Sequence, residues 1–189
     1  MRARTLLAAL AAAFVCRTAA AGTFSIKGIY GADDRREPSQ VESPRIRAWA
    51  DSTVALFEAN SVALDTTTGK DALTTQPFKA AGVQTPDNPW GQWVDLCPEE
   101  RFKGQAQGAF CSGSLVAPDL VMTAGHCVDS EDQCKAGIKF VFGFDVGAGG
   151  KAPSEVPADQ VYGCAQVVAR QLDMNGPDFT LVRLDRPVK

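Results

Sequence analysis

The sequence contains a single histidine, and its setting suggests acid–base chemistry. His126 follows an apolar run that ends in small residues, Val121 to Gly125, and Cys127 comes directly after it. An imidazole exchanges a proton near neutral pH and can therefore act as a general base, although an isolated histidine is more often structural or simply exposed. His126 is the first candidate catalytic residue.

A carboxylate further along the chain is a candidate partner for that imidazole. Asp178 stands immediately before a β-branched and apolar run, Phe179 to Leu184. An aspartate in that position is typical of a turn at the start of a strand. Beside an imidazole, however, it accepts a hydrogen bond from the ring, selects the tautomer and stabilises the imidazolium formed when the ring deprotonates a nucleophile. Position along the chain does not show whether the two side chains meet.

The cysteines near His126 offer a metal site as an alternative. Cys111, Cys127, Cys134 and His126 are residue types that zinc accepts as ligands. Zinc sites usually contain cysteine pairs separated by about two to four residues, and the gaps here are longer. An oxidising compartment also favours disulfides over thiolate ligands. We therefore expect neither a metal ion nor another cofactor.

The N-terminus predicts export. Arg2 and Arg4 give a positive start, the run from Thr5 to Cys16 is apolar, and Ala19 to Ala21 offers small residues for a signal peptidase. We predict a signal peptide over residues 1–21 and a secreted protein, either extracellular or periplasmic. The apolar run is shorter than the ~20 residues that a membrane span needs, and Val15 is bulky for a lipid anchor on Cys16. No membrane partner is expected after cleavage.

Cleavage leaves an odd number of cysteines. The remaining five are Cys97, Cys111, Cys127, Cys134 and Cys164. One thiol is therefore free, or its partner lies outside this sequence.

Short β-branched and aromatic runs alternate with turn-forming clusters along the rest of the chain. They predict strands near 52–57, 108–116, 120–122, 138–144, 161–169 and 179–184, with Val54 and Leu56 on one face of the first. Residues 66–88 read as loop and 143–157 as a hairpin-like loop. No long segment has a helical period, so the expected fold is an all-β sandwich or barrel. We expect an extended arm over 22–47 and the barrel over 48–189.

Composition agrees with a globular protein and excludes one class of partner. Hydrophobic residues make up 45% of the chain and charged residues 22%, which are ordinary globular values. The chain has 19 basic and 22 acidic side chains, for a net charge of −3. A polyphosphate partner needs a surplus of basic side chains, which this chain does not have, so no nucleic-acid binding is expected.

Three motifs together resemble a known enzyme family. Cys111 to Val116, then Thr123 to Cys127, then Asp178 to Leu181 are similar to the first half of a trypsin-like (chymotrypsin-fold) serine endopeptidase. The segment from Ile29 to Arg35 further resembles the bacterial glutamyl-endopeptidase-like branch. The resemblance extends from Lys27 to the C-terminus. It implies an antiparallel β-barrel and a protein or peptide substrate.

The resemblance also implies a role for each site residue. His126 would be the general base and later the general acid, and Asp178 would orient it. Cys111 and Cys127 would form the disulfide of the histidine loop, and Cys134 and Cys164 remain as a second pair. Gly125 departs from the alanine common in animal members, and its small size leaves the fold compatible.

The nucleophile of that family is missing from the sequence. The family order of histidine, aspartate and serine requires a serine after Asp178, and residues 179–189 contain none. Ser112 and Ser114 lie upstream in a segment that the family uses structurally. We therefore expect the first of two barrels with the second absent, a chain that is inactive alone, and a site completed by a C-terminal barrel or another chain. The alternative is a non-catalytic, protease-like binding protein.

Overall fold

The computed structural model describes residues 32–78, 80–81, 93–94 and 101–189. The chain divides into two units, Met1–Arg35 and Arg36–Lys189. Within the described part of the first unit, Asp33 and Arg35 form an ion pair at 2.8 Å. The predicted signal peptide, Cys16 and Cys97 lie outside the described residues. The helices and strands that the structure describes lie in the second unit.

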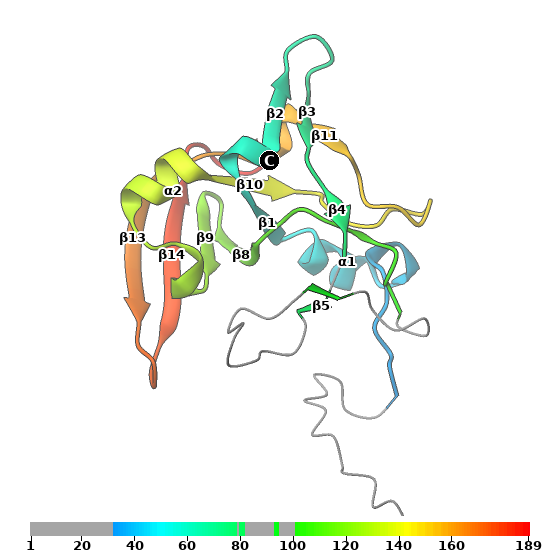
Figure 1. The fold of residues 1–189 in the computed structure, drawn as a ribbon, viewed down its shortest axis with the longest axis horizontal. Helices are drawn as coiled ribbons and strands as arrows, with labels where there is room; N and C mark the ends of the chain where they lie inside the picture. The colour runs from blue at the N-terminus through cyan, green and yellow to red at the C-terminus, as the bar shows by residue number, and fades with distance from the viewer. Residues whose placement is uncertain (1–31, 79, 82–92, 95–100) are drawn as a thin grey trace, which may run out of the picture. The chain divides into compact units, whose positions relative to one another are not determined.

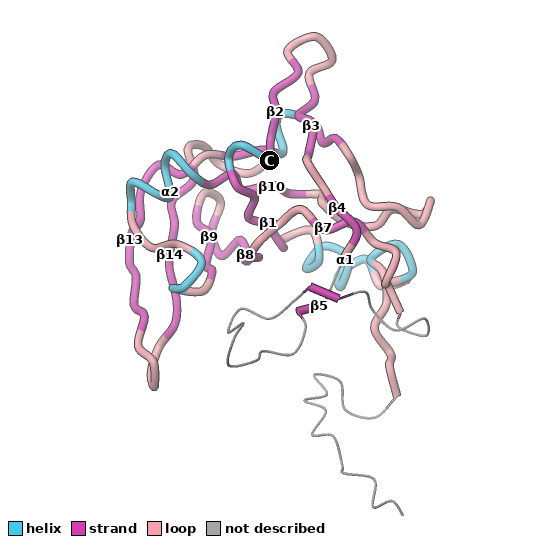
Figure 2. The backbone as a smooth tube through the Cα atoms, viewed as in Figure 1, coloured by secondary structure: helices cyan, strands magenta, loops and turns pink. Residues whose placement is uncertain are grey.

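A seven-stranded antiparallel sheet forms the centre of this unit (Figures 1 and 2). In spatial order its strands are β12 (Val161–Tyr162), β10 (Ile138–Phe142), β1 (Thr53–Glu58), β8 (Cys111–Ala117), β9 (Leu120–Thr123), β14 (Asp178–Leu184) and β13 (Cys164–Leu172). The two edge strands, β12 and β13, are joined in the chain by Gly163 alone. A sheet whose two edges are consecutive in sequence must curl on itself, as in a barrel. The prediction of an all-β, barrel-type fold is confirmed.

The inner face of the curled sheet forms the core. Val54 and Leu56 of β1 are both 0% exposed, as their alternation predicts. The buried cluster around them combines aliphatic and aromatic side chains from β9, β10, β12 and β14, among them Val121, Phe140, Phe142, Tyr162, Val182 and Leu184. These residue types suit a pleated and closely packed surface. The expected strands near β8, β9, β10, β13 and β14 are therefore present, each within a few residues of its predicted position.

A second sheet takes one strand from each of the two segments expected to be loop, 66–88 and 143–157. Its three strands are β2 (Val62–Asp65), β3 (Lys70–Leu73) and β11 (Glu155–Pro157), with β3 in the middle. The prediction of a loop over 66–88 is wrong for β3, and so is the hairpin-like loop over 143–157, since β11 pairs with β3. Two shorter pairs follow, β4 (Gln76–Pro77) with β7 (Ala106–Gln107) and β5 (Ala80–Ala81) with β6 (Trp93–Val94). Pairing between distant segments had no local signal in the sequence.

Two helices of seven residues each were also not predicted. They are α1 (Pro44–Ala50) and α2 (Glu131–Gly137). The segment 22–47 was expected to be an extended arm, but its last residues, from Pro44, form the start of α1. Proline at the first position of α1 and Ser130 at the N-cap of α2 explain where these helices start. Seven residues are too few to display a helical period.

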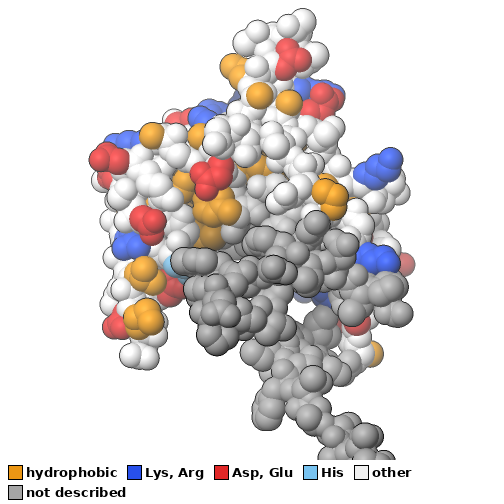
Figure 3. Space-filling view, viewed as in Figure 1, with side chains coloured by type: hydrophobic (Ala, Val, Ile, Leu, Met, Phe, Trp, Pro, Cys, Tyr) orange, Lys and Arg blue, Asp and Glu red, His pale blue; other side chains and the backbone are white. Residues whose placement is uncertain are grey.

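Four single 3-10 turns lie in the described part of the chain: η1 (Pro38–Gln40) precedes α1, η2 (Ala59–Ser61) and η4 (Ala158–Gln160) each join two strands, and η3 (Gly125–Cys127) lies between β9 and α2. Within the described part of the chain, none of the helices has the length and apolarity needed to cross a bilayer. Some large hydrophobic side chains reach the surface, notably Val116 and Met122, which are 53% and 49% exposed. In the space-filling view, hydrophobic side chains lie scattered among acidic and basic ones (Figure 3).

A disulfide fastens α2 to the edge of the main sheet. Cys134 in α2 and Cys164 at the start of β13 are bonded, and they are 0% and 9% exposed. The bond closes a segment with a sequence separation of 30 and so restricts the unfolded chain. It is a buried crosslink within the core cluster.

Replacing both of these cysteines with alanine should lower the free energy of unfolding by about 2–4 kcal/mol, because the unfolded chain regains the freedom of that loop. Urea unfolding followed by circular dichroism measures the change. Treating the unaltered protein with a reductant should destabilise it at least as much, since both disulfides are then open. A double variant as stable as its parent contradicts this assignment.

Candidate active site

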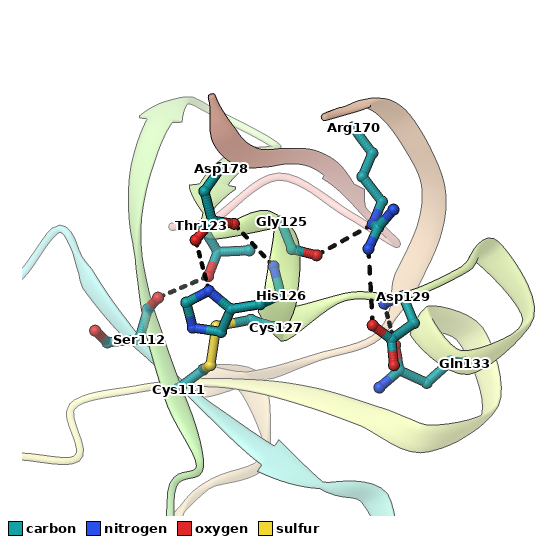
Figure 4. Close-up of a disulfide and its surroundings, with 10 residues drawn as sticks. All are labelled: Cys111, Ser112, Thr123, Gly125, His126, Cys127, Asp129, Gln133, Arg170 and Asp178. Atoms are coloured by element: carbon teal, nitrogen blue, oxygen red, sulfur yellow. Dashed lines mark hydrogen bonds and ion pairs between the residues drawn. A yellow bond between two sulfur atoms is a disulfide. The ribbon is translucent and has the colours of Figure 1, made fainter. Parts of the chain in front are cut away.

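A short turn after β9 presents His126 to solvent. The turn η3 contains Gly125, His126 and Cys127, and the two residues that flank the histidine are buried. Cys127 is bonded to Cys111 of β8, with their Cα atoms 6.1 Å apart. The backbone is thus anchored on both sides, and the imidazole is left outside the core (Figure 4).

A hydrogen bond at the end of β9 supports the same turn. The Thr123 hydroxyl donates to the backbone oxygen of Ser112 at 2.7 Å. This bond joins β9 to β8 at the residue that precedes the turn by two positions. The path of the chain into η3 is therefore held by a disulfide, a side-chain hydrogen bond and the strand pairing.

Asp178 meets His126 through both of its carboxylate oxygens. It is the first residue of β14, and pairing of Thr180 with Thr123 places the start of β14 beside the turn that follows β9. The backbone N–H of His126 donates to Oδ1 at 3.0 Å, and the ring Nδ1 lies 2.6 Å from Oδ2. Figure 4 shows the imidazole turned toward this carboxylate. Because an ionised carboxylate only accepts hydrogen bonds, Nδ1 carries a proton and Nε2 of the neutral ring keeps its lone pair.

The pair remains accessible to solvent. The side chain of His126 is 63% exposed and that of Asp178 is 37% exposed. The hydrogen bond from the His126 side chain is the main cause that lowers the pKa of Asp178 below its ordinary value of 3.8, and the backbone N–H of His126 adds to it. Desolvation acts in the opposite direction. The carboxylate thus stays ionised when it is needed to stabilise an imidazolium.

This arrangement has the geometry that the acid–base half of nucleophilic catalysis requires. Nε2 can take a proton from a hydroxyl, and Asp178 stabilises the charge that results. Among the described residues, the hydrogen-bond partner of the imidazole is Asp178, and no serine hydroxyl bonds to the ring. Ser112 and Ser114 lie on β8, whose residues pair with β1 and β9 as ordinary sheet members.

The same residues include a group that resembles a metal site. The ligand atoms of Cys111, His126 and Cys127 lie within 4.8 Å of one another. The two sulfurs are bonded to each other, and Cys134 is bonded to Cys164. These sulfurs offer no thiolate, which is the form that binds zinc.

Two features of the site had no signal in the sequence. Arg170 of β13 donates hydrogen bonds to the backbone oxygens of Gly125 and Val128, on either side of His126. Gly125 itself is required by close packing, because a Cβ there would lie 2.4 Å from the backbone oxygen of Gln171 and 2.9 Å from Oδ1 of Asp178. The glycine is therefore more than a tolerated small residue.

A curled antiparallel sheet in which the first residue of one strand, an aspartate, binds a histidine just after the neighbouring strand is the arrangement of a trypsin-like serine-protease domain. Comparison with family models agrees: the model described as Trypsin matches residues 82–189. That match covers more than half of the chain, and the chain belongs to the trypsin family. The resemblance to trypsin-like serine endopeptidases noted in the sequence is therefore confirmed as membership of this family. No curated protein matches the chain.

Titration of Asp178 tests the pairing directly. Its pKa is expected below 3.8, and stability due to the pair is present above that pH and lost as pH falls through the lower, folded-state pKa. Changing His126 to alanine should move the carboxyl midpoint upward, although the backbone N–H still donates. Carbon-13 NMR of the side-chain carboxyl follows both proteins.

Asp65 provides the control, since its pKa is lowered by hydrogen bonds from Thr67 and Thr68 and does not depend on His126. Its midpoint should be the same in both proteins. An unshifted Asp178 midpoint in the His126 variant contradicts the geometry of the pair.

Substitution of Gly125 by alanine tests the close packing. The added Cβ forces β13 and Asp178 away from the turn, and overpacking of this kind costs about 1–3 kcal/mol of unfolding free energy. Chemical denaturation measures this cost. Gly147 is the matched control, because a Cβ there meets nothing within 4 Å. Equal stability of the two alanine variants is the outcome that contradicts the prediction.

Proposed function

We propose that this chain supplies the acid–base half of a secreted serine endopeptidase. The observation that carries the proposal is the double contact of Asp178 with His126, at 3.0 Å to the backbone N–H and 2.6 Å to Nδ1. Few structural tasks need one carboxylate to hold both the backbone and the ring of a solvent-exposed histidine. A general base needs both, because its Nε2 must point at the proton that it removes.

In the proposed mechanism, His126 Nε2 removes the proton from a serine hydroxyl as that oxygen attacks the peptide carbonyl. Asp178 stabilises the imidazolium and keeps the ring from rotating. The imidazolium then donates the same proton to the nitrogen of the leaving amine, and the cycle repeats with water to release the acid. Membership of the trypsin family supports a protein or peptide as the substrate.

The nucleophile, oxyanion donors and specificity pocket are proposed to come from residues outside this sequence. Residues 179–189 contain no serine, and the family order places the nucleophile after the aspartate. A C-terminal barrel or a second chain would bring them to Nε2 and cover Asp178, which is 37% exposed. Val116 and Met122 are exposed apolar side chains on the neighbouring strands β8 and β9, and such a partner could cover them.

The remaining features of the proposal concern processing and subfamily. Residues 1–21 would be removed on export, 22–47 would form an arm and 48–189 the first barrel. Two buried or half-buried disulfides support an oxidising destination. The segment from Ile29 to Arg35 supports placement in the glutamyl-endopeptidase-like branch, and that likeness suggests a preference for glutamate in the substrate.

Hydrolysis of a broad peptide substrate tests the proposal. The chain from Gly22 to Lys189 should show no turnover alone, because the base has no hydroxyl to activate. Joined with the segment or chain that carries the serine, it should hydrolyse the peptide, and His126→Ala should lower kcat by about 10⁴–10⁶-fold. Turnover by the isolated chain that His126→Ala abolishes contradicts the requirement for a partner.

The second candidate is a non-catalytic binding protein with a protease-like barrel. The observation that favours it is the absence, among the described residues, of any serine bonded to His126. A stop codon directly after Lys189, together with a stable exported protein, supports this alternative. A reading frame that continues into a Gly-x-Ser-Gly-Gly motif supports the endopeptidase.

A further inference from the structure

Arg170 reaches from β13 to the turn that carries His126. It pairs with Thr180 of β14, two residues from Asp178 on that strand. Its Nε donates to the backbone oxygen of Gly125 at 3.1 Å and to that of Val128 at 2.5 Å. The side chain is 27% exposed, and Figure 4 shows it directed at the Gly125 carbonyl from the side opposite the disulfide.

The two acceptors are carbonyls that the short turn leaves without helical partners. A single 3-10 turn such as η3 is too short to satisfy its own backbone groups, so its carbonyls need donors from elsewhere. The single Nε–H of Arg170 is shared between two such carbonyls, those of Gly125 and Val128, on either side of His126. A guanidinium is suited to this because its N–H groups are fixed in one plane and carry positive charge.

The contact with Gly125 has a specific consequence for His126. The C=O of Gly125 and the N–H of His126 belong to one peptide unit, which is planar and points these groups in opposite directions. The C=O accepts from Arg170, and the N–H donates to Asp178. One peptide plane is therefore held from both sides, by side chains of two adjacent strands.

Loss of one of these two hydrogen bonds removes a restraint on rotation of this peptide plane. Glycine has the widest choice of backbone conformations, so rotation about Gly125 is cheap unless a hydrogen bond prevents it. A rotation redirects the Cα–Cβ bond of His126, and the ring then leaves the carboxylate. The disulfide at Cys127 does not prevent this, since it acts on the far side of the histidine.

We propose that Arg170 is a positioning residue, which locks the peptide plane before His126 and thereby keeps the imidazole on Asp178. The inference rests on the proposed function, because a catalytic base needs its ring held in one orientation. The neighbouring Asp129 lies 3.7 Å from the guanidinium and is 73% exposed, so it contributes little to the hold.

The test uses the full chain and the fact that it has one histidine. A proton shared between Nδ1 and a carboxylate gives a far-downfield NMR signal, and this chain can give only one such imidazole signal. Arg170→Ala should abolish or strongly broaden that signal and shift the carboxyl midpoint of Asp178 upward. A purely structural arginine would lower stability and leave both readouts unchanged, and this result overturns the proposal.

Arg183→Ala is the matched control. Arg183 lies on β14 and pairs with Asp119 at 2.7 Å, and it makes no bond to the histidine turn. Its replacement should lower the stability of the sheet and leave the His126 signal in place. Loss of the signal in this control as well means that any damage to the sheet releases the ring, which also overturns the proposal.

Two further variants complete the test. If Arg170→Ala does not fold, Arg170→Lys replaces it: lysine keeps the stem and the charge but has no donor at the Nε position, so a weaker form of the same change is expected. An unchanged signal in Arg170→Lys then counts against the proposal. Asp178→Asn separates the two hypotheses. If it removes the signal and neither Arg170 variant does, only the inference on Arg170 fails; if it leaves the signal unchanged, the proposed catalytic pair fails as well.

Discussion

One carboxylate that binds two different groups of the same histidine is the interaction on which the site depends. Oδ1 of Asp178 accepts from the backbone of His126, and Oδ2 accepts from its ring. The backbone contact fixes where the side chain starts, and the ring contact fixes where it points. Both require β14 to lie beside β9, so the order of strands in the sheet is a precondition for the chemistry.

The barrel holds the backbone rigidly next to the imidazole of His126, which itself stays exposed to solvent. Cys127 and Val128 are buried directly after His126, whereas the imidazole is 63% exposed. In water the charge of Asp178 is screened, and its influence on the ring grows when solvent is excluded. A partner that covers the pair would therefore strengthen the same contacts without moving them, which is the usual way in which preorganised sites gain catalytic power.

The oxidation state of Cys111 and Cys127 decides whether their sulfurs could bind a metal ion or form a disulfide. Reduced, the sulfurs of Cys111 and Cys127 would lie close enough to His126 for a common metal ligand set. Bonded to each other, they stiffen the turn and leave the imidazole to Asp178. The disulfide thus favours the histidine–aspartate pair in two ways, by removing thiolates that could bind a metal ion and by anchoring the residue after His126.

The sequence alone determined the β-rich character of the chain, and it singled out His126 and Asp178 as the candidate site residues. Alternation in β1 and the motifs around His126 and Asp178 are local patterns, and local patterns reflect the preferences of neighbouring residues. The short helices α1 and α2 escaped because seven residues show no period. Only the tertiary structure decided that His126 meets Asp178, that β3 pairs with β11 and that Arg170 holds the histidine turn. These contacts join distant segments, and several of them end on backbone oxygens, which every residue possesses and which therefore leave no mark in the sequence.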